Sequence, residues 1–121
     1  MFEPELYISL TTFRRSGQPV STPVWFVEDS GKLYVGTEAQ AGKVKRLRNN
    51  PEVEVAPCTR RGKPTGPAVK ALCRILNPSE EPRPRSLISQ KYGSWKVQIL
   101  AWIVRLRRRR PALLEINLNS P

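Results

Sequence analysis

Short segments in which apolar and polar residues alternate run through most of the chain, and such alternation is typical of β-strands with one buried face. In residues 5–14, one face carries Leu6, Ile8 and Leu10, and the other carries Tyr7, Ser9, Thr11 and Phe13. Further strands are predicted at residues 19–28, 32–36, 52–58, 68–76 and 113–118. Six strands in antiparallel succession, joined mainly by short connections, predict a mainly β domain that closes into a small barrel.

Two positions along these strands carry specific backbone signals. Asp29, Ser30 and Gly31 separate two of the strands and predict a tight hairpin. Pro23 interrupts the second strand, and a proline inside a strand belongs at a sheet edge or at a bulge. Because bulges commonly lie beside binding sites, we expect a bulge at Pro23, with an ordinary edge-strand proline as the alternative.

The helical segments have a different periodicity. Residues 36–50, GTEAQAGKVKRLRNN, predict a strand end followed by a short basic helix whose apolar side is Val44 and Leu47, ending before Pro51. A second helix is predicted over residues 85–92. Beyond it, one apolar helix face is predicted by the spacing of Trp95, Ile99, Trp102, Ile103 and Leu106, and a run of basic residues follows at Arg105–Arg110.

The basic helix in residues 36–50 is a candidate anion site. A helix N-terminus offers unpaired backbone N–H groups and a partial positive charge, both of which stabilise an anion such as phosphate. Lys43 and Arg46 lie three residues apart and therefore share one helix face. The alternative is a solvated basic face with no ligand.

Composition narrows the chemistry that the chain can perform. Lys and Arg number 21 against 10 Asp and Glu, a net charge of +11 that favours anionic partners. Histidine is absent, which removes the commonest general base. Cys58 and Cys73 lack CxxC spacing, which argues against a zinc site, and we expect them to be small core residues without a disulfide. Any chemistry must therefore depend on a cofactor.

Length and hydropathy predict the organisation of the chain. At 121 residues it is expected to be a single domain, 1–121, with a barrel core at residues 5–76 and 112–118 and a helical excursion at 78–107. No apolar run is long enough to span a membrane, and the first residues, MFEPE, do not form a signal pattern. We therefore expect a cytoplasmic protein.

Two stretches of the sequence carry a family resemblance: YISLTTFRRSGQPVSTPVWF and LYVGTEAQAGKVKRLRNNPEVEVAPCTRRGKPTGP. Together they resemble the flavin-reductase-like split-barrel proteins related to pyridoxamine 5'-phosphate oxidase. Within that superfamily, the chain is most similar to the branch that uses the deazaflavin coenzyme F420 instead of FMN. The resemblance covers residues 6–76, with a family-like end at 113–118. It implies a homodimer of six-stranded split barrels with cofactor sites at the subunit interface.

The resemblance also implies which residues bind the cofactor. The first patch is Thr22, Pro23 and Val24, whose backbone would approach the tricyclic ring. The second is Gly36, Thr37 and Lys43 at the phosphate, with Arg46 one turn on. The third is Ala56 to Arg61, in which Cys58 and Arg61 lie near the site. Trp25, Trp95 and Trp102 are candidates for interface or ring contacts. No catalytic side chain and no metal ligand is implied.

The implied activity is that of an F420-dependent oxidoreductase, which transfers a hydride between the reduced coenzyme and a small conjugated organic substrate. The cofactor carries such chemistry while the protein supplies orientation and electrostatics. Two alternatives remain. The first keeps the fold but makes the chain an FMN-binding protein, or a flavin or deazaflavin carrier without turnover. The second is a basic nucleic-acid-binding module, although no nucleic-acid motif is present.

Overall fold

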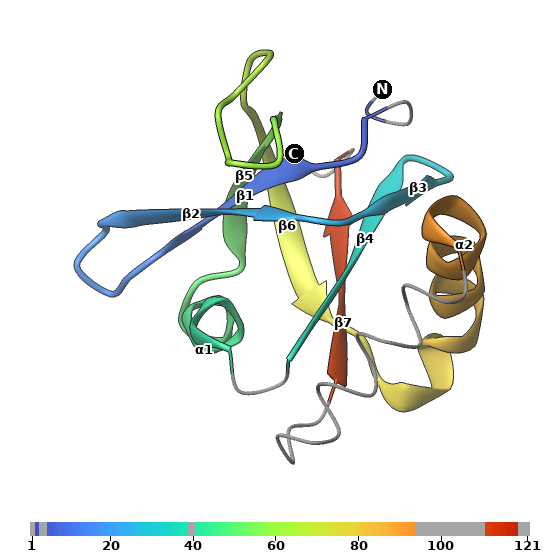
Figure 1. The fold of residues 1–121 in the computed structure, drawn as a ribbon. Coiled ribbons are helices and arrows are strands. Elements are labelled where there is room, and N and C mark those ends of the chain that lie inside the picture. The colour runs from blue at the N-terminus through green and yellow to red at the C-terminus, as the bar shows by residue number, and fades with distance from the viewer. Residues whose placement is uncertain (1, 3–4, 39–40, 94–110, 119–121) are drawn as a thin grey trace.

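A computed structural model of the chain describes residues 2, 5–38, 41–93 and 111–118 (Figure 1). The elements in chain order are β1 (Ile8–Phe13), β2 (Pro19–Val24), β3 (Val27–Asp29), β4 (Lys32–Glu38), α1 (Gly42–Asn49), β5 (Glu52–Pro57), β6 (Val69–Ile75), the 3₁₀ turn η1 (Pro78–Glu80), α2 (Pro82–Tyr92) and β7 (Pro111–Asn117).

All described strands belong to one antiparallel sheet in the order β2-β1-β5-β6-β7-β4-β3. The sheet curls around its buried face, with α1 near the β1–β2 end and α2 beside β3 (Figure 1). This architecture confirms the prediction of a mainly β, split-barrel-like fold. It has seven strands where the sequence predicted six.

The additional strand arises because residues 19–28 form two strands, β2 and β3, and not one. Between them, the backbone N–H of Phe26 donates to the hydroxyl of Tyr92 at 3.0 Å, so this residue is held by α2 and not by a neighbouring strand. The predicted bulge at Pro23 is wrong. The β1–β2 register runs without a break from Ile8↔Val24 to Phe13↔Pro19, and β2 is an edge strand, where a proline is tolerated.

The hairpin between β3 and β4 is confirmed. Asp29 pairs with Lys32, and the two residues between them have positive φ, 55° for Ser30 and 79° for Gly31, as a type I′ turn requires. The predicted burial of Leu6 is wrong. β1 begins only at Ile8, and Leu6 is 58% exposed.

The helix α1 confirms the prediction for residues 36–50, since it ends at Asn49 and buries Val44 and Leu47. Both side chains join the main core, which also contains residues from all strands but β3. The most buried members of this core are Ile8, Leu10, Phe26, Leu33, Val35, Val44, Val53, Val55, Leu114 and Ile116. The core thus fixes α1 against β1 and positions its N-terminus.

The helix α2 begins at Pro82, earlier than the predicted residue 85, because Pro is tolerated in the first helical turn. It covers a second apolar cluster containing Val27, Leu76, Ile88, Tyr92 and Leu113. The helix predicted at residues 95–106 and the basic run at 105–110 lie outside the described residues. Among the described helices, none combines the length and apolar character needed to cross a membrane.

Candidate functional site

The first and third predicted patches lie on either side of β1. Ser9 of β1 pairs with Pro23 of β2 on one side and with Ala56 of β5 on the other. Ser9 and Ala56 are buried, at 7% and 6% exposure, although strand alternation places them on the face opposite the barrel core. Thr22 and Val24 have the opposite orientation, because they pair with Leu10 and Ile8 of the core face.

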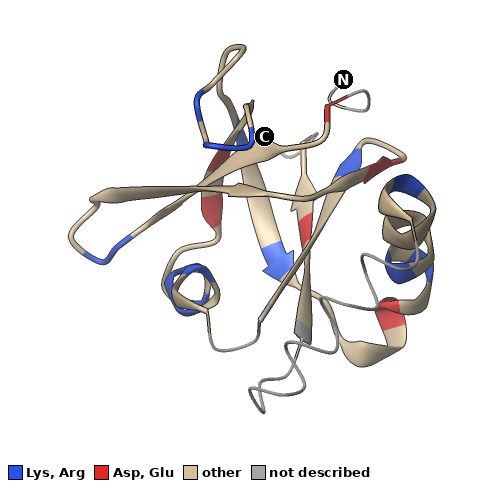
Figure 2. Cartoon of the chain, viewed as in Figure 1, with Lys and Arg blue, Asp and Glu red and all other residues tan. Residues whose placement is uncertain are grey.

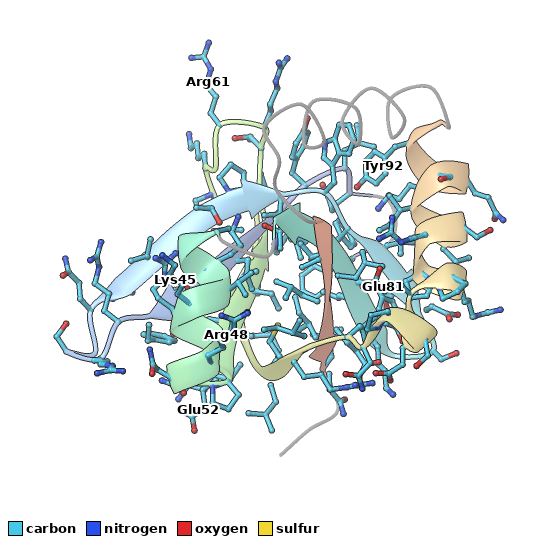
Figure 3. The ribbon with its side chains drawn as sticks, turned by 90° about the horizontal axis from the view of Figure 1, so that it is seen from below. Lys45, Arg48, Glu52, Arg61, Glu81 and Tyr92 are labelled. Carbon is cyan, nitrogen blue, oxygen red and sulfur yellow. The ribbon has the colours of Figure 1, made fainter. Side chains whose placement is uncertain are left out.

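The loop after β5 lies against the first patch. A Cβ added to Gly62 would stand 3.6 Å from Cδ of Pro23, so the two backbones are close neighbours. The loop is closed by hydrogen bonds from the Thr59 backbone N–H to the Lys63 carbonyl and from the Gly62 N–H to the Thr59 carbonyl, at 2.9 and 2.8 Å. Arg61 is exposed and extends away from the sheet at this loop (Figure 3). Its charge is therefore presented to solvent.

Cys58 lies at the base of this loop but its thiol is buried, with 4% of the residue exposed. Burial raises the pKa of the thiol, and the neighbouring Glu5 raises it further. Cys73 is also buried and free, and burial raises its pKa to about 12. Both cysteines are therefore small apolar core residues and not reactive thiolates, as the sequence predicted.

The second predicted patch is divided between β4 and α1. Gly36 and Thr37 pair with Leu113 and Ala112 of β7. Lys43 is half-buried in the first turn of α1, where no acidic side chain and no side-chain cap are present. The backbone N–H groups of Val44 and Lys45 both donate to the carbonyl of Ala41. The first N–H groups of a helix have no partner within the helix itself.

Arg46 is held in a defined position across this helix start. Its Nε donates to Oγ1 of Thr12 at 2.6 Å, and Thr12 is fully buried in β1. A Cβ on Gly42 would lie 2.9 Å from Nη1 of Arg46, so the guanidinium lies directly over Gly42. Burial lowers the pKa of Arg46, and the positive charge of Arg14 lowers it further. The guanidinium therefore lies in a partly dry, electropositive place, where an anion would be stabilised.

The arrangement brings some predicted residues together and leaves others apart. Thr12 and Leu10 lie on the same face of β1, about 7 Å apart along the strand, and Thr22 is paired with Leu10. Arg46, which bonds Thr12, therefore reaches the sheet face on which Thr22 lies. No side-chain hydrogen bond or ion pair within the described ranges joins Gly36 or Thr37 to either of the other patches.

Tyr92 was not among the predicted site residues, yet it fixes the segment that follows Val24. Its hydroxyl accepts from the Phe26 N–H at 3.0 Å and lies 2.8 and 2.9 Å from the carbonyls of Leu6 and Phe26, to which it can donate. Its ring is stacked on Trp25, with centroids 4.6 Å apart. This also assigns Trp25 a contact within the subunit. Burial raises the pKa of Tyr92 to about 12.

Comparison with known families gives one match over nearly the whole chain. The family model described as pyridoxamine 5'-phosphate oxidase matches residues 2–118. A comparison with curated proteins finds no match.

Solved structures share the fold at low sequence identity. The heme storage protein HutZ from Vibrio cholerae has a TM-score of 0.73 at 14% identity, covering 97% of this chain and 84% of its own. A conserved hypothetical protein from Mycobacterium tuberculosis has a TM-score of 0.69 at 18% identity, covering 94% and 73%. An F420 reductase has a TM-score of 0.60 at 16% identity, covering 98% and 90%. Proteins with different functions therefore share this architecture.

Proposed function

Because the chain belongs to the pyridoxamine 5'-phosphate oxidase family, we propose that it is an oxidoreductase that uses the deazaflavin coenzyme F420. The observation that carries this proposal is the start of α1. Lys43 lies in its first turn, which has no acidic residue, and the guanidinium of Arg46 in the last turn reaches back over Gly42. Such a site suits the phosphodiester of a coenzyme. The similarity to an F420 reductase favours the deazaflavin over FMN, which is the alternative.

The remaining residues of the proposed site suit a flat ring. β2 is an edge strand, so half of its backbone N–H and C=O groups point away from the sheet and are available to a ring laid against Thr22, Pro23 and Val24. When bound, the coenzyme would supply the hydride chemistry. The protein would orient it through β2, hold its phosphate at Gly36, Thr37, Lys43 and Arg46, and border it with the segment from Cys58 to Arg61.

We further propose that two copies of the chain form a homodimer with the cofactor between them. The outer face of β1, β5 and β6 supports a second copy, because it contains a hollow of about 340 Å³ lined in part by Phe13, Glu54, Lys70 and Leu72. Leu72 is 38% exposed there, which is unusual for a large apolar side chain in a strand. A second subunit would cover it.

The test is a fluorescence titration of the purified protein with oxidised F420 and, separately, with FMN. Lys43→Ala should weaken F420 binding about 10- to 100-fold, the effect of losing a hydrogen bond to a charged group. Lys45→Ala is the matched control, because it removes the same charge from an exposed position on the same helix and should change the affinity much less. Equal losses in the two variants would show that only net charge matters, and the assignment of Lys43 would fail.

A carrier without turnover shares the same fold and the same binding residues. It differs in one measurement: an enzyme oxidises reduced coenzyme in the presence of a conjugated acceptor, whereas a carrier does not. A role in heme storage, as in the Vibrio cholerae protein, is not favoured, because the chain has no histidine to ligate the iron and its two thiols are buried.

A further inference from the structure

The charged side chains of the described residues are distributed unevenly over the molecule. At the end of the sheet that α2 covers, basic side chains pair with acidic ones, and Figure 2 shows both kinds there. The ion pairs at this end are Arg74 with Glu80 and with Glu115, Lys32 with Glu115, Arg83 with Asp29, and Arg85 with Glu81, at N···O distances between 2.6 and 3.8 Å. The charges at this end therefore largely cancel.

The opposite end, formed by the β1–β2 hairpin and α1, carries positive charge alone. Residues 6–27 and 41–51 contain no Asp or Glu. Figure 2 shows basic residues at the hairpin and on α1, with no acidic residue on either. Four of these basic residues are exposed and form no ion pair with another described residue: Arg14, Arg15, Lys45 and Arg48. Uncompensated positive charge is therefore presented to solvent at this end.

Hydrogen bonds join the hairpin to α1. Nη2 of Arg15 donates to Oδ1 of Asn49 at 3.2 Å, and Nδ2 of Asn49 donates to the carbonyl of Lys45 at 3.3 Å. Lys45 and Arg48 lie three residues apart and share the exposed side of α1. The hairpin tip and this side of the helix are therefore continuous. We call Arg14, Arg15, Lys45 and Arg48 the hairpin–α1 surface.

The composition of the hairpin–α1 surface limits the kind of anionic partner. Among the described residues, the large apolar side chains that are exposed are Leu6 and Leu72, and both lie outside the hairpin and α1. Protein interfaces and membrane-bound helices are anchored by apolar or aromatic side chains, and single-stranded nucleic acids stack on exposed aromatic rings. The phosphate backbone of a duplex requires only cations and hydrogen-bond donors. Ser16 and Gln18, both exposed in the hairpin turn, add uncharged donors to the four cations.

We propose that the hairpin–α1 surface binds double-stranded DNA through its phosphate backbone, without reading the base sequence. Arginine suits this role, because the parallel N–H donors of its guanidinium match two phosphate oxygens at once. The hairpin extends beyond the rest of the sheet (Figure 1), and the major groove admits a two-stranded β-ribbon. Lys43 and Arg46, at the proposed coenzyme site, are not part of this surface, so the inference does not require F420 or any redox activity.

The experiment is a fluorescence anisotropy titration of a fluorescein-labelled DNA duplex of mixed sequence with the purified protein. The dissociation constant should be about 10⁻⁴ to 10⁻⁶ M at physiological salt. If each of the four cations neutralises one phosphate, the logarithm of the binding constant should fall against the logarithm of the salt concentration with a slope of about −3 to −4. A duplex of a different sequence should bind equally well.

Three double variants, each lacking two positive charges, test where the duplex binds. Two of them change the hairpin–α1 surface: Arg14→Gln with Arg15→Gln, and Lys45→Gln with Arg48→Gln. Each should weaken binding about tenfold and make the salt slope less steep by about 2. The control is Arg60→Gln with Lys63→Gln, in the exposed loop after β5 that extends away from α1 (Figures 1 and 3), and it should weaken binding less than about threefold. Circular dichroism checks that each variant is folded.

Three results would overturn the proposal. Equal losses of affinity in the three double variants would show that only the net charge matters. Displacement of the duplex by poly-glutamate, or by vesicles that contain phosphatidylserine, at an equal or lower concentration of negative charge would indicate an acidic peptide or a membrane as the partner. The absence of saturable binding at about 50 mM salt would also overturn it, because binding to a phosphate backbone is strongest at low salt.

Discussion

Replacing Tyr92 by Phe tests how α2 holds the segment between β2 and β3. The change keeps the ring, and hence the stacking on Trp25, but removes the hydroxyl that lies between the Phe26 N–H and the carbonyls of Leu6 and Phe26. Phe26 is fully buried, so its polar groups would lose their partner without gaining water. Leaving such groups unsatisfied costs about 1–3 kcal/mol. We therefore expect the free energy of unfolding to fall by about 2–3 kcal/mol.

The assay is urea unfolding followed by tryptophan fluorescence, together with calorimetry. For a domain of this size, about 1 kcal/mol corresponds to about 4 °C, so the thermal midpoint should fall by about 8–12 °C. A loss below about 0.5 kcal/mol would refute the reasoning, because it would mean that water replaces the hydroxyl and that Phe26 does not depend on α2.

The same hydroxyl predicts a dependence on alkaline pH. Burial raises the pKa of Tyr92 from the usual 10.0 to about 12, so the folded state retains the proton after the unfolded state has lost it. Stability is therefore fully present below pH 10 and decreases as the pH rises toward 12, by about 2–3 kcal/mol. Tyr92→Phe should lack this part of the decrease. Identical alkaline profiles for the two proteins would contradict the assignment.

Three further predictions concern the acid limb, the core and the outer sheet face. Two parallel hydrogen bonds from Arg74 are the main cause that lowers the pKa of Glu80 from 4.5 to about 2. Part of the stability present above pH 4.5 is therefore lost as the pH falls toward 2. Glu80→Gln should reduce this pH dependence in acid unfolding curves. Leu47→Ala should lower the free energy of unfolding by about 2–5 kcal/mol in urea, whereas Leu6→Ala, at a position that is 58% exposed, should change it by less than about 0.5 kcal/mol. The molar mass from light scattering after gel filtration tests the proposed dimer. Leu72→Glu should give the mass of a monomer, whereas Leu6→Glu should keep the mass of a dimer. A monomer mass for the wild-type protein at all concentrations would contradict the proposed dimer.

Local signals in the sequence predicted the elements that local physics determines. The hairpin at Ser30 and Gly31 follows from residues that tolerate positive φ. The basic helix follows from the spacing of Val44 and Leu47 and from Pro51, which ends it. Each of these features depends on neighbours within one turn, and each was predicted with nearly the observed bounds.

Features that depend on distant residues could not be predicted in the same way. The β2–β3 break relies on Tyr92, which is 66 residues from Phe26 in sequence. The position of Arg46 relies on Thr12, which is 34 residues away. Alternation indicates which face a strand residue lies on, but it does not reveal which helix side chain will reach that face. For this reason Lys43 and Arg46 were predicted as a pair, whereas the contact of Arg46 with Thr12 was missed.

The measurement that tests the central claim most directly is the absorbance and mass spectrum of the purified protein after incubation with equal concentrations of oxidised F420 and FMN. The proposed function predicts that F420 co-purifies through gel filtration with the protein, and that its retention is reduced by Lys43→Ala. Retention of FMN alone would contradict the choice of coenzyme. Retention of neither would contradict the proposal that this barrel carries out cofactor-dependent redox chemistry.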